Sequence, residues 1–126
     1  MDNRYNNGHG GSKISKDVFE KITNLKYDGV KMYEGERLLL KLSAFPDYVS
    51  EALNRRMSDV NFTFEYDKIV LDKWGKKDVR TKRFVEIPEM VFYRAAMFAA
   101  DGLKKNDASL DYESTVESIF NKFANK

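Results

Sequence analysis

The residues whose types and spacing best suit a chemical role are the basic ones of segment 73–83. Six cations occur there beside Trp74 and Phe84, namely Lys73, Lys76, Lys77, Arg80, Lys82 and Arg83. They could bind phosphates, single-stranded nucleic acid or a partner protein, because cations pair with the nucleic-acid backbone and aromatic rings stack on bases. Asp72 and Asp78 dilute the charge, and charge runs are usually solvated. The alternative is therefore a solvated hairpin whose two aromatic side chains face the core.

Acidic side chains are grouped at two places where acid–base catalysis would be conceivable. They are Glu34 with Glu36, and Asp107 with Asp111 and Glu113. General acid–base catalysis needs a carboxyl group whose pKa is shifted in a cleft, and nothing in the sequence indicates that any of these is buried. We interpret them as surface charge that complements helix dipoles.

Cysteine, histidine and glycine patterns exclude most other catalytic chemistry. The chain has no cysteine, which excludes disulfides, zinc–thiolate sites, iron–sulfur ligation and thiol catalysis. The one histidine, His9, lies in a Gly/Asn-rich stretch where a catalytic base would be poorly oriented. The glycines match neither GxGxxG nor GxxxxGKS/T. The sequence therefore predicts a chain that is not catalytic on its own, with no metal site and no cofactor.

Composition fits one folded domain. The chain has 126 residues, of which 42% are hydrophobic and 13% aromatic, enough for a core. Twenty-two basic residues against 20 acidic ones give a net charge of +2, too small by itself to indicate nucleic acid or a membrane. No apolar run approaches the length of a membrane span, and the N-terminus lacks an apolar signal-peptide segment. Together with the lack of cysteine, these features favour the cytoplasm, or the host cytoplasm if the protein is viral.

The elements that must position these residues begin after a Gly/Asn-rich stretch. Residues 1–13 are expected to be a flexible tail, and residues 14–126 a single helical domain. Ser15 is typical of a helix N-cap, so a helix begins directly after it. Gly29, in the sequence YDGV, ends that helix. A short buried helix follows, and Pro46 fits the first turn of the next one.

Residues 62–74 fit two patterns. Aromatic residues at positions 62, 64 and 66 alternate as in a strand. Tyr66, Val70 and Trp74, however, recur every four residues as on a helix. Period alone leaves both structures open for a run this short.

The C-terminal half is expected to contain one hairpin and two helices. A short β-hairpin is predicted near residues 75–87, and Pro88 then opens an alanine-rich helix that another helix can approach closely. The Asp-Gly pair at 101–102 ends that helix, and the last one starts near Asp107 or Ser109. The prediction is a mainly α, small helical domain of about five helices with one short β-hairpin.

Four segments occur in a familiar order. They are RRMSDVNFTFEY (55–66), DKIVLDKW (67–74), DVRTKRFVEIPEMVFYRAAMFAADG (78–102) and DYESTVESIFNKFA (111–124). From about residue 44 to residue 124, this order and spacing resembles the N-terminal helical region of the large subunit of class I ribonucleotide reductases, especially the phage and enterobacterial branch. The third segment is similar to the family's hairpin, proline and helix with an "mfmRvA" pattern.

The resemblance implies scaffold without catalysis. The family's radical chemistry needs cysteines, and this chain has none. Residues 1–43 carry no recognisable version of the family's nucleotide-binding cone, and no catalytic or effector residue has a counterpart here. We therefore expect a non-catalytic piece of a split large subunit, as found in phages, which is completed by a separately encoded barrel-bearing chain. A relic reused as a binding module, or a likeness that arose by convergence, would also account for the resemblance.

A second hypothesis comes from a different class. The chain could be a small self-contained viral or phage interaction protein that binds a host protein or nucleic acid. That hypothesis predicts a closed core and a basic ridge over residues 73–83, with nucleic-acid binding that weakens steeply in salt. The reductase hypothesis predicts a large exposed apolar patch and a helix over DKIVLDKW. Under both, the principal partner is expected to be another protein chain, with nucleic acid second and no membrane.

Overall fold

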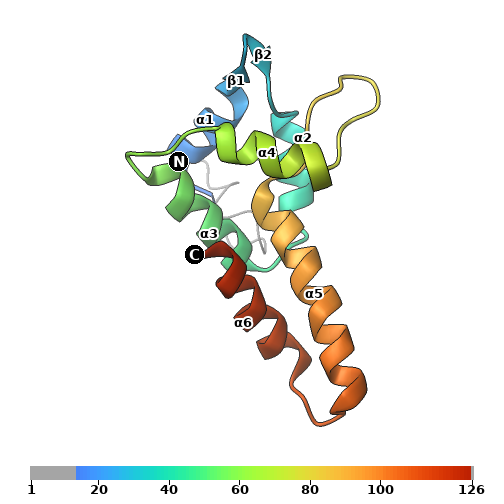
Figure 1. Cartoon of the computed structure of the whole chain (residues 1–126). Coiled ribbons are helices and arrows are strands. Elements are labelled where there is room, and N and C mark those ends of the chain that lie inside the picture. The colour runs from blue at the N-terminus through green and yellow to red at the C-terminus, as the bar shows by residue number, and fades with distance from the viewer. Residues whose placement is uncertain (1–13, 126) are drawn as a thin grey trace.

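The computed structural model describes residues 14–125 (Figure 1). Within that range the chain forms six helices: α1 (Lys16–Asn24), α2 (Gly35–Leu42), α3 (Asp47–Ser58), α4 (Glu65–Trp74), α5 (Pro88–Asn106) and α6 (Tyr112–Ala124). One antiparallel hairpin, β1 (Lys26–Tyr27) and β2 (Val30–Lys31), lies between α1 and α2. The mainly helical class with a single short hairpin is confirmed, with six helices where about five were expected. The tail predicted over residues 1–13, with His9, lies outside the described residues.

Local capping places several helix starts where the sequence predicts them. The Ser15 hydroxyl accepts the Val18 N–H at 3.1 Å, so α1 begins at its N-cap signal. Pro88 occupies the first position of α5, where its missing N–H costs no hydrogen bond. The ambiguous run resolves as a helix from residue 65, and Phe62 and Phe64 precede it with ring centroids 5.6 Å apart.

The regular hairpin lies elsewhere than expected. Asp28 and Gly29 both have positive φ, 53° and 80°, which is the backbone that a two-residue hairpin turn requires. Residues 75–87 form no regular strands. Phe84 instead makes isolated bridges to both Lys77 and Tyr33, so the segment is a hairpin-like loop pinned beside the end of β2. No regular strands form here because residues 78–83 already make a tight turn, in which Lys82 has a positive φ of 62°.

Helix α5 does not end at the Asp-Gly pair. It continues through residues 101–102 to Asn106, because Gly102 keeps a negative φ and does not adopt the left-handed stop that was predicted. The Asp107 N–H then bonds to the Leu103 carbonyl at 3.1 Å. The last helix correspondingly begins at Tyr112, a few residues later than predicted.

The helices pack in two parts that share α5. Helices α1, α2 and α3 bury their apolar faces together, and α4 lies across the start of α5 (Figure 1). Helices α5 and α6 run antiparallel and extend away from the others. Ala96 and Ala100 on α5, and Val116 and Phe120 on α6, are buried in that pair, and the two small alanines let the helices approach closely. The junction of α3, α4, α5 and the end of α6 is where a cleft forms.

Candidate functional site

An open cleft of about 460 Å³ lies at the junction of α3, α4, α5 and α6. Four aromatic side chains line it: Phe62, Tyr66, Phe92 and Phe123. The Tyr66 and Phe92 ring centroids are 6.4 Å apart, and those of Phe92 and Phe123 are 6.2 Å apart. We call this the aromatic cleft. Its aromatic walls and open mouth are typical of a binding site.

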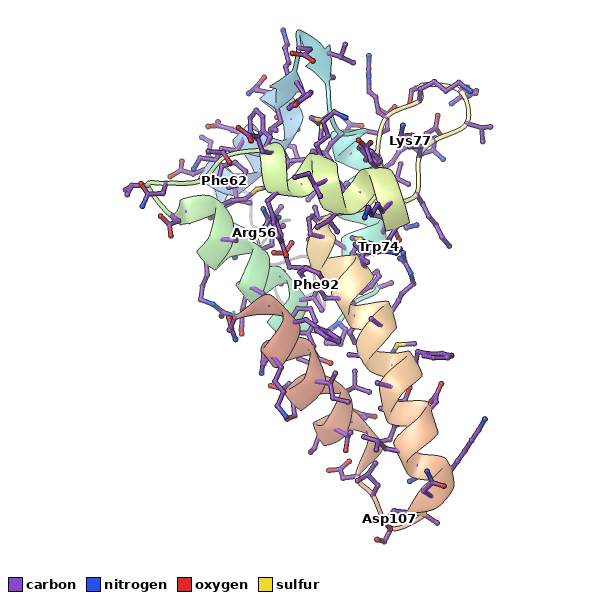
Figure 2. All side chains as sticks on the ribbon, viewed as in Figure 1. Arg56, Phe62, Trp74, Lys77, Phe92 and Asp107 are labelled. Carbon is purple, nitrogen blue, oxygen red and sulfur yellow. The ribbon has the colours of Figure 1, made fainter. Side chains whose placement is uncertain are left out.

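A buried ionic cluster forms one side of the aromatic cleft. Arg56, on α3, donates to Glu89 of α5 through Nε at 2.6 Å and Nη2 at 3.0 Å. It also donates to Asp67 of α4 through Nη1 at 2.5 Å and Nη2 at 3.2 Å. The Tyr33 hydroxyl donates to Oδ2 of Asp67 at 2.5 Å, the same oxygen that accepts from Nη2 of Arg56. We call these four residues the Arg56 network; Figure 2 shows Arg56 pointing between α4 and α5.

The charged groups of the Arg56 network are largely buried, so each needs its partner in place of water. The Asp67 and Glu89 side chains are 0% and 2% exposed, and Arg56 is 20% exposed. Burial alone lowers the pKa of Arg56, but the charges and hydrogen bonds of the two carboxylates outweigh it and raise that pKa. Burial, and then the Asp67 charge, raise the pKa of Tyr33 well above its ordinary value. Arg56 therefore stays charged and Tyr33 keeps its proton, and the paired side chains are suited to holding α3, α4 and α5 together.

The guanidinium of Arg56 also lies against the aromatic wall. Its carbon is 5.7 Å from the Phe62 ring centroid and 5.6 Å from that of Tyr66. Contacts of this kind are attractive, because the faces of aromatic rings carry negative potential. Arg56 thus contacts two of the four rings that line the cleft, Phe62 and Tyr66, as well as joining three of the helices around it.

The six basic residues predicted as a contact surface all lie in one part of the molecule. Lys73, Lys76, Lys77, Arg80 and Lys82 are exposed and Arg83 is half-buried. None of the six forms an ion pair with any residue in the range 14–125. We call residues 75–87 the basic loop; it projects beside α2 in Figure 1, and Lys77 marks its base in Figure 2.

Three acids near the basic loop are paired with cations outside the predicted set. Asp78 is buried and pairs with Arg37 of α2, while Asp72 pairs with Lys68 at 2.6 Å. Glu86, also buried, pairs with Arg94 of α5. Asp72 and Asp78, which were expected to offset the charge of the six basic residues, therefore neutralise Lys68 and Arg37 instead.

Two aromatic side chains beside the basic loop differ in burial. Phe84 is 5% exposed and joins the core, whereas Trp74 is 59% exposed at the end of α4. The alternative in which both aromatics face the core is thus wrong for Trp74. The cations approach both rings, with Lys73 Nζ 5.7 Å from the Trp74 centroid and Lys77 Nζ 4.9 Å from that of Phe84.

Of the other candidate acids, Glu36, Asp107, Asp111 and Glu113 are exposed and Glu34 is half-buried. Asp107 is exposed and accepts from the Ser109 hydroxyl and N–H, which lowers its pKa. Asp111 is exposed and accepts from the Ser114 hydroxyl, with the same effect on its pKa.

Across residues 14–125, no three carboxylate or imidazole side chains gather as metal ligands would. None of the described helices combines the length and hydropathy needed to cross a bilayer.

The Arg56 network was missed by sequence reasoning. None of Arg56, Asp67, Glu89 and Tyr33 was assigned a functional role from the sequence. The partners of Arg56 are 11 and 33 residues away along the chain, and Tyr33 is 34 residues from Asp67. No local pattern connects residues at such separations, so only the folded arrangement reveals the cluster.

Comparisons with protein-family models, with curated proteins and with solved structures found no match for this chain. The resemblance to the reductase family therefore stays a prediction.

Proposed function

We propose that this protein is a non-catalytic assembly module that binds another protein chain through the aromatic cleft. The observation that carries the proposal is the row of rings from Tyr66 through Phe92 to Phe123 along an open cleft. Protein interfaces concentrate their binding energy in a few anchors, often aromatic, that fill such pockets. An apolar or aromatic side chain of the partner is the expected occupant.

The Arg56 network supports the proposal because it makes the cleft rigid before binding. Three of the helices around the cleft, α3, α4 and α5, are tied together by the guanidinium through Asp67 and Glu89. A site that is already ordered loses little entropy when a partner docks. The same pairing engages both buried carboxylates of the network with Arg56, which fits a binding role better than a catalytic one.

For the partner, we propose the barrel-bearing chain of a split class I ribonucleotide reductase large subunit. The resemblance over residues 44–124 is the ground for this choice. Two features support it: α4 spans DKIVLDKW, as this hypothesis requires, and Ile69 and Trp74 leave apolar surface uncovered on α4. The alternative is a self-contained viral or phage protein that presents the same cleft to a host protein.

The experiment is co-purification of the tagged chain with the barrel-bearing product of a neighbouring reading frame, followed by a nucleotide-reduction assay. We expect a complex that reduces ribonucleotides only when both chains are present. Tyr66→Ala should weaken that complex about 30-fold or more, as loss of a hot-spot aromatic does. Phe98→Ala removes a more exposed ring of α5 outside the cleft and should change affinity by less than about threefold.

Two results would count against the proposal. A chain that stays monomeric and forms no complex with the barrel-bearing chain rules out the reductase partner. A complex that Tyr66→Ala and Phe98→Ala weaken equally rules out the cleft as the docking site. Circular dichroism of both variants checks that the fold is retained.

A further inference from the structure

We propose that the end of α4 and the basic loop form a binding surface for single-stranded nucleic acid, separate from the aromatic cleft. Six cations gather there, and none forms an ion pair with a described residue, while the neighbouring acids Asp72, Asp78 and Glu86 are paired with other cations. Uncompensated cations on one surface attract a polyanion and release its counterions on binding. The surface is thus complementary in charge to a phosphate backbone.

The basic loop is built to hold its cations in place. The Asp78 carboxylate accepts the N–H groups of Arg80 at 3.1 Å and Thr81 at 2.9 Å, and it pairs with Arg37. Backbone bonds close the loop, from the Asp78 N–H to the Arg83 carbonyl at 2.8 Å and from the Lys82 N–H to the Asp78 carbonyl at 2.9 Å. A loop closed in this way presents its cations with less ordering cost than a mobile chain would.

Trp74 supplies the second requirement for binding an unpaired strand. Its ring is 59% exposed although the side chain is large and apolar, and Arg94 Nη2 donates to its carbonyl at 3.2 Å, which fixes the end of α4. The ammonium of Lys73 lies over the ring, 5.7 Å from its centroid, so a phosphate-binding cation adjoins the stacking ring. Stacking on an exposed ring requires an unpaired base, which favours a single strand over a duplex.

The test uses the full chain and a fluorescent oligothymidylate of about 20 nucleotides, with the duplex of the same length and poly-glutamate as competitors. Trp74 is the one tryptophan of the sequence, so its intrinsic fluorescence reports directly on stacking. We expect binding in low salt, quenching of Trp74, and a logarithmic salt slope of up to about −4, since each of six cations contributes about −0.7 on a single strand.

Matched variants separate this surface from general positive charge. Lys76→Gln with Lys77→Gln should weaken binding about 10-fold or more and reduce the salt slope by about 1.4. Lys104→Gln with Lys105→Gln neutralises another adjacent, exposed lysine pair at the far end of α5 and should change little. Trp74→Ala should weaken binding about 5- to 150-fold, whereas Phe98→Ala, which removes another exposed ring, should have no effect.

Several outcomes would overturn the proposal. These are no binding in low salt, binding without quenching of Trp74, equal losses for the two lysine pairs, and a duplex or poly-glutamate competing as well as the single strand. If the cleft variant Tyr66→Ala still binds the oligothymidylate, the surface is separate from the cleft. If Tyr66→Ala weakens that binding as much as Trp74→Ala does, the two sites are not separate.

Discussion

Arg56 and the basic loop hold positive charge in opposite surroundings. Arg56 is largely buried and directs its donors to two carboxylates that are themselves buried. Five of the six basic residues of segment 73–83 are exposed and Arg83 is half-buried, and three nearby acids, Asp72, Asp78 and Glu86, are paired with other cations. Removing the charge of Arg56 should therefore lower the free energy of unfolding, because that charge compensates buried anions. Removing charge from the basic loop should raise it slightly, because the cations there repel one another.

The largest effect is expected when the buried cation is removed. Arg56→Met leaves Asp67 and Glu89 buried without a counter-charge, which should lower the free energy of unfolding by about 3–5 kcal/mol. Urea unfolding followed by circular dichroism measures it. Arg55→Met, at the adjacent exposed position, is the matched control and should cost less than about 0.5 kcal/mol.

A quadruple variant separates the causes of that loss. Replacing Arg56 with Met, Asp67 and Glu89 with Leu, and Tyr33 with Phe removes the stranded anions together with the cation and leaves no Tyr33 hydroxyl without its acceptor. Buried ion clusters replaced by apolar groups of similar volume often keep or gain stability, so most of the loss should be recovered. A quadruple variant as unstable as Arg56→Met would show that packing, not the unpaired polar groups, causes the loss.

The next effect concerns pH and Tyr33. The pKa of this buried phenol is raised, so above pH 10, tyrosine's ordinary pKa, the unfolded chain loses the proton while the folded chain keeps it. Stability from this group is thus complete below pH 10 and is lost as pH rises further. Tyr33→Phe should cost about 1.5–3 kcal/mol at pH 8, through the lost bond to Asp67, yet show a shallower alkaline decline. Equal alkaline slopes for the two proteins would contradict this account.

The comparison also separates what can be predicted from sequence from what cannot. Ser15 and Pro88 mark helix starts correctly, because capping and proline geometry act within one turn. The basic segment was found because its residues are neighbours in sequence. The pairing of Asp78 with Arg37, 41 residues away, was not, since nothing local specifies it.

Two other misses have a similar origin. The Asp-Gly pair at 28–29 was expected to give a left-handed helix stop or turn, and the structure shows a hairpin turn. Its strands are only two residues long, too short to give an alternating pattern in the sequence. The Asp-Gly pair at 101–102 lies inside a helix, where pairing with α6 outweighs the poor helix propensity of glycine. Tertiary packing thus decides between turn and helix for the same dipeptide.

A smaller loss is expected when the frame of the basic loop is broken. Asp78→Ala removes the acceptor for the Arg80 and Thr81 N–H groups and the partner of Arg37, and should cost about 1–2 kcal/mol. Hydrogen exchange at Arg80 and Thr81 should accelerate. Asp72→Ala, which breaks only a surface pair with Lys68, should cost less than about 0.5 kcal/mol. Unchanged exchange at the two amides would mean that the loop is held by other contacts.

The smallest expected effect is a gain in stability rather than a loss. Replacing Lys76 and Lys82 with Gln removes two of the unpaired cations, so repulsion within the basic loop falls while no described ion pair is lost. The free energy of unfolding should rise by less than about 0.5 kcal/mol at low ionic strength. The gain should vanish near 1 M salt, where the Debye length is about 3 Å. Urea titrations at both salt concentrations measure it. A loss of stability at low salt would mean that these lysines stabilise the fold, and the contrast with Arg56 would then be one of degree rather than of sign.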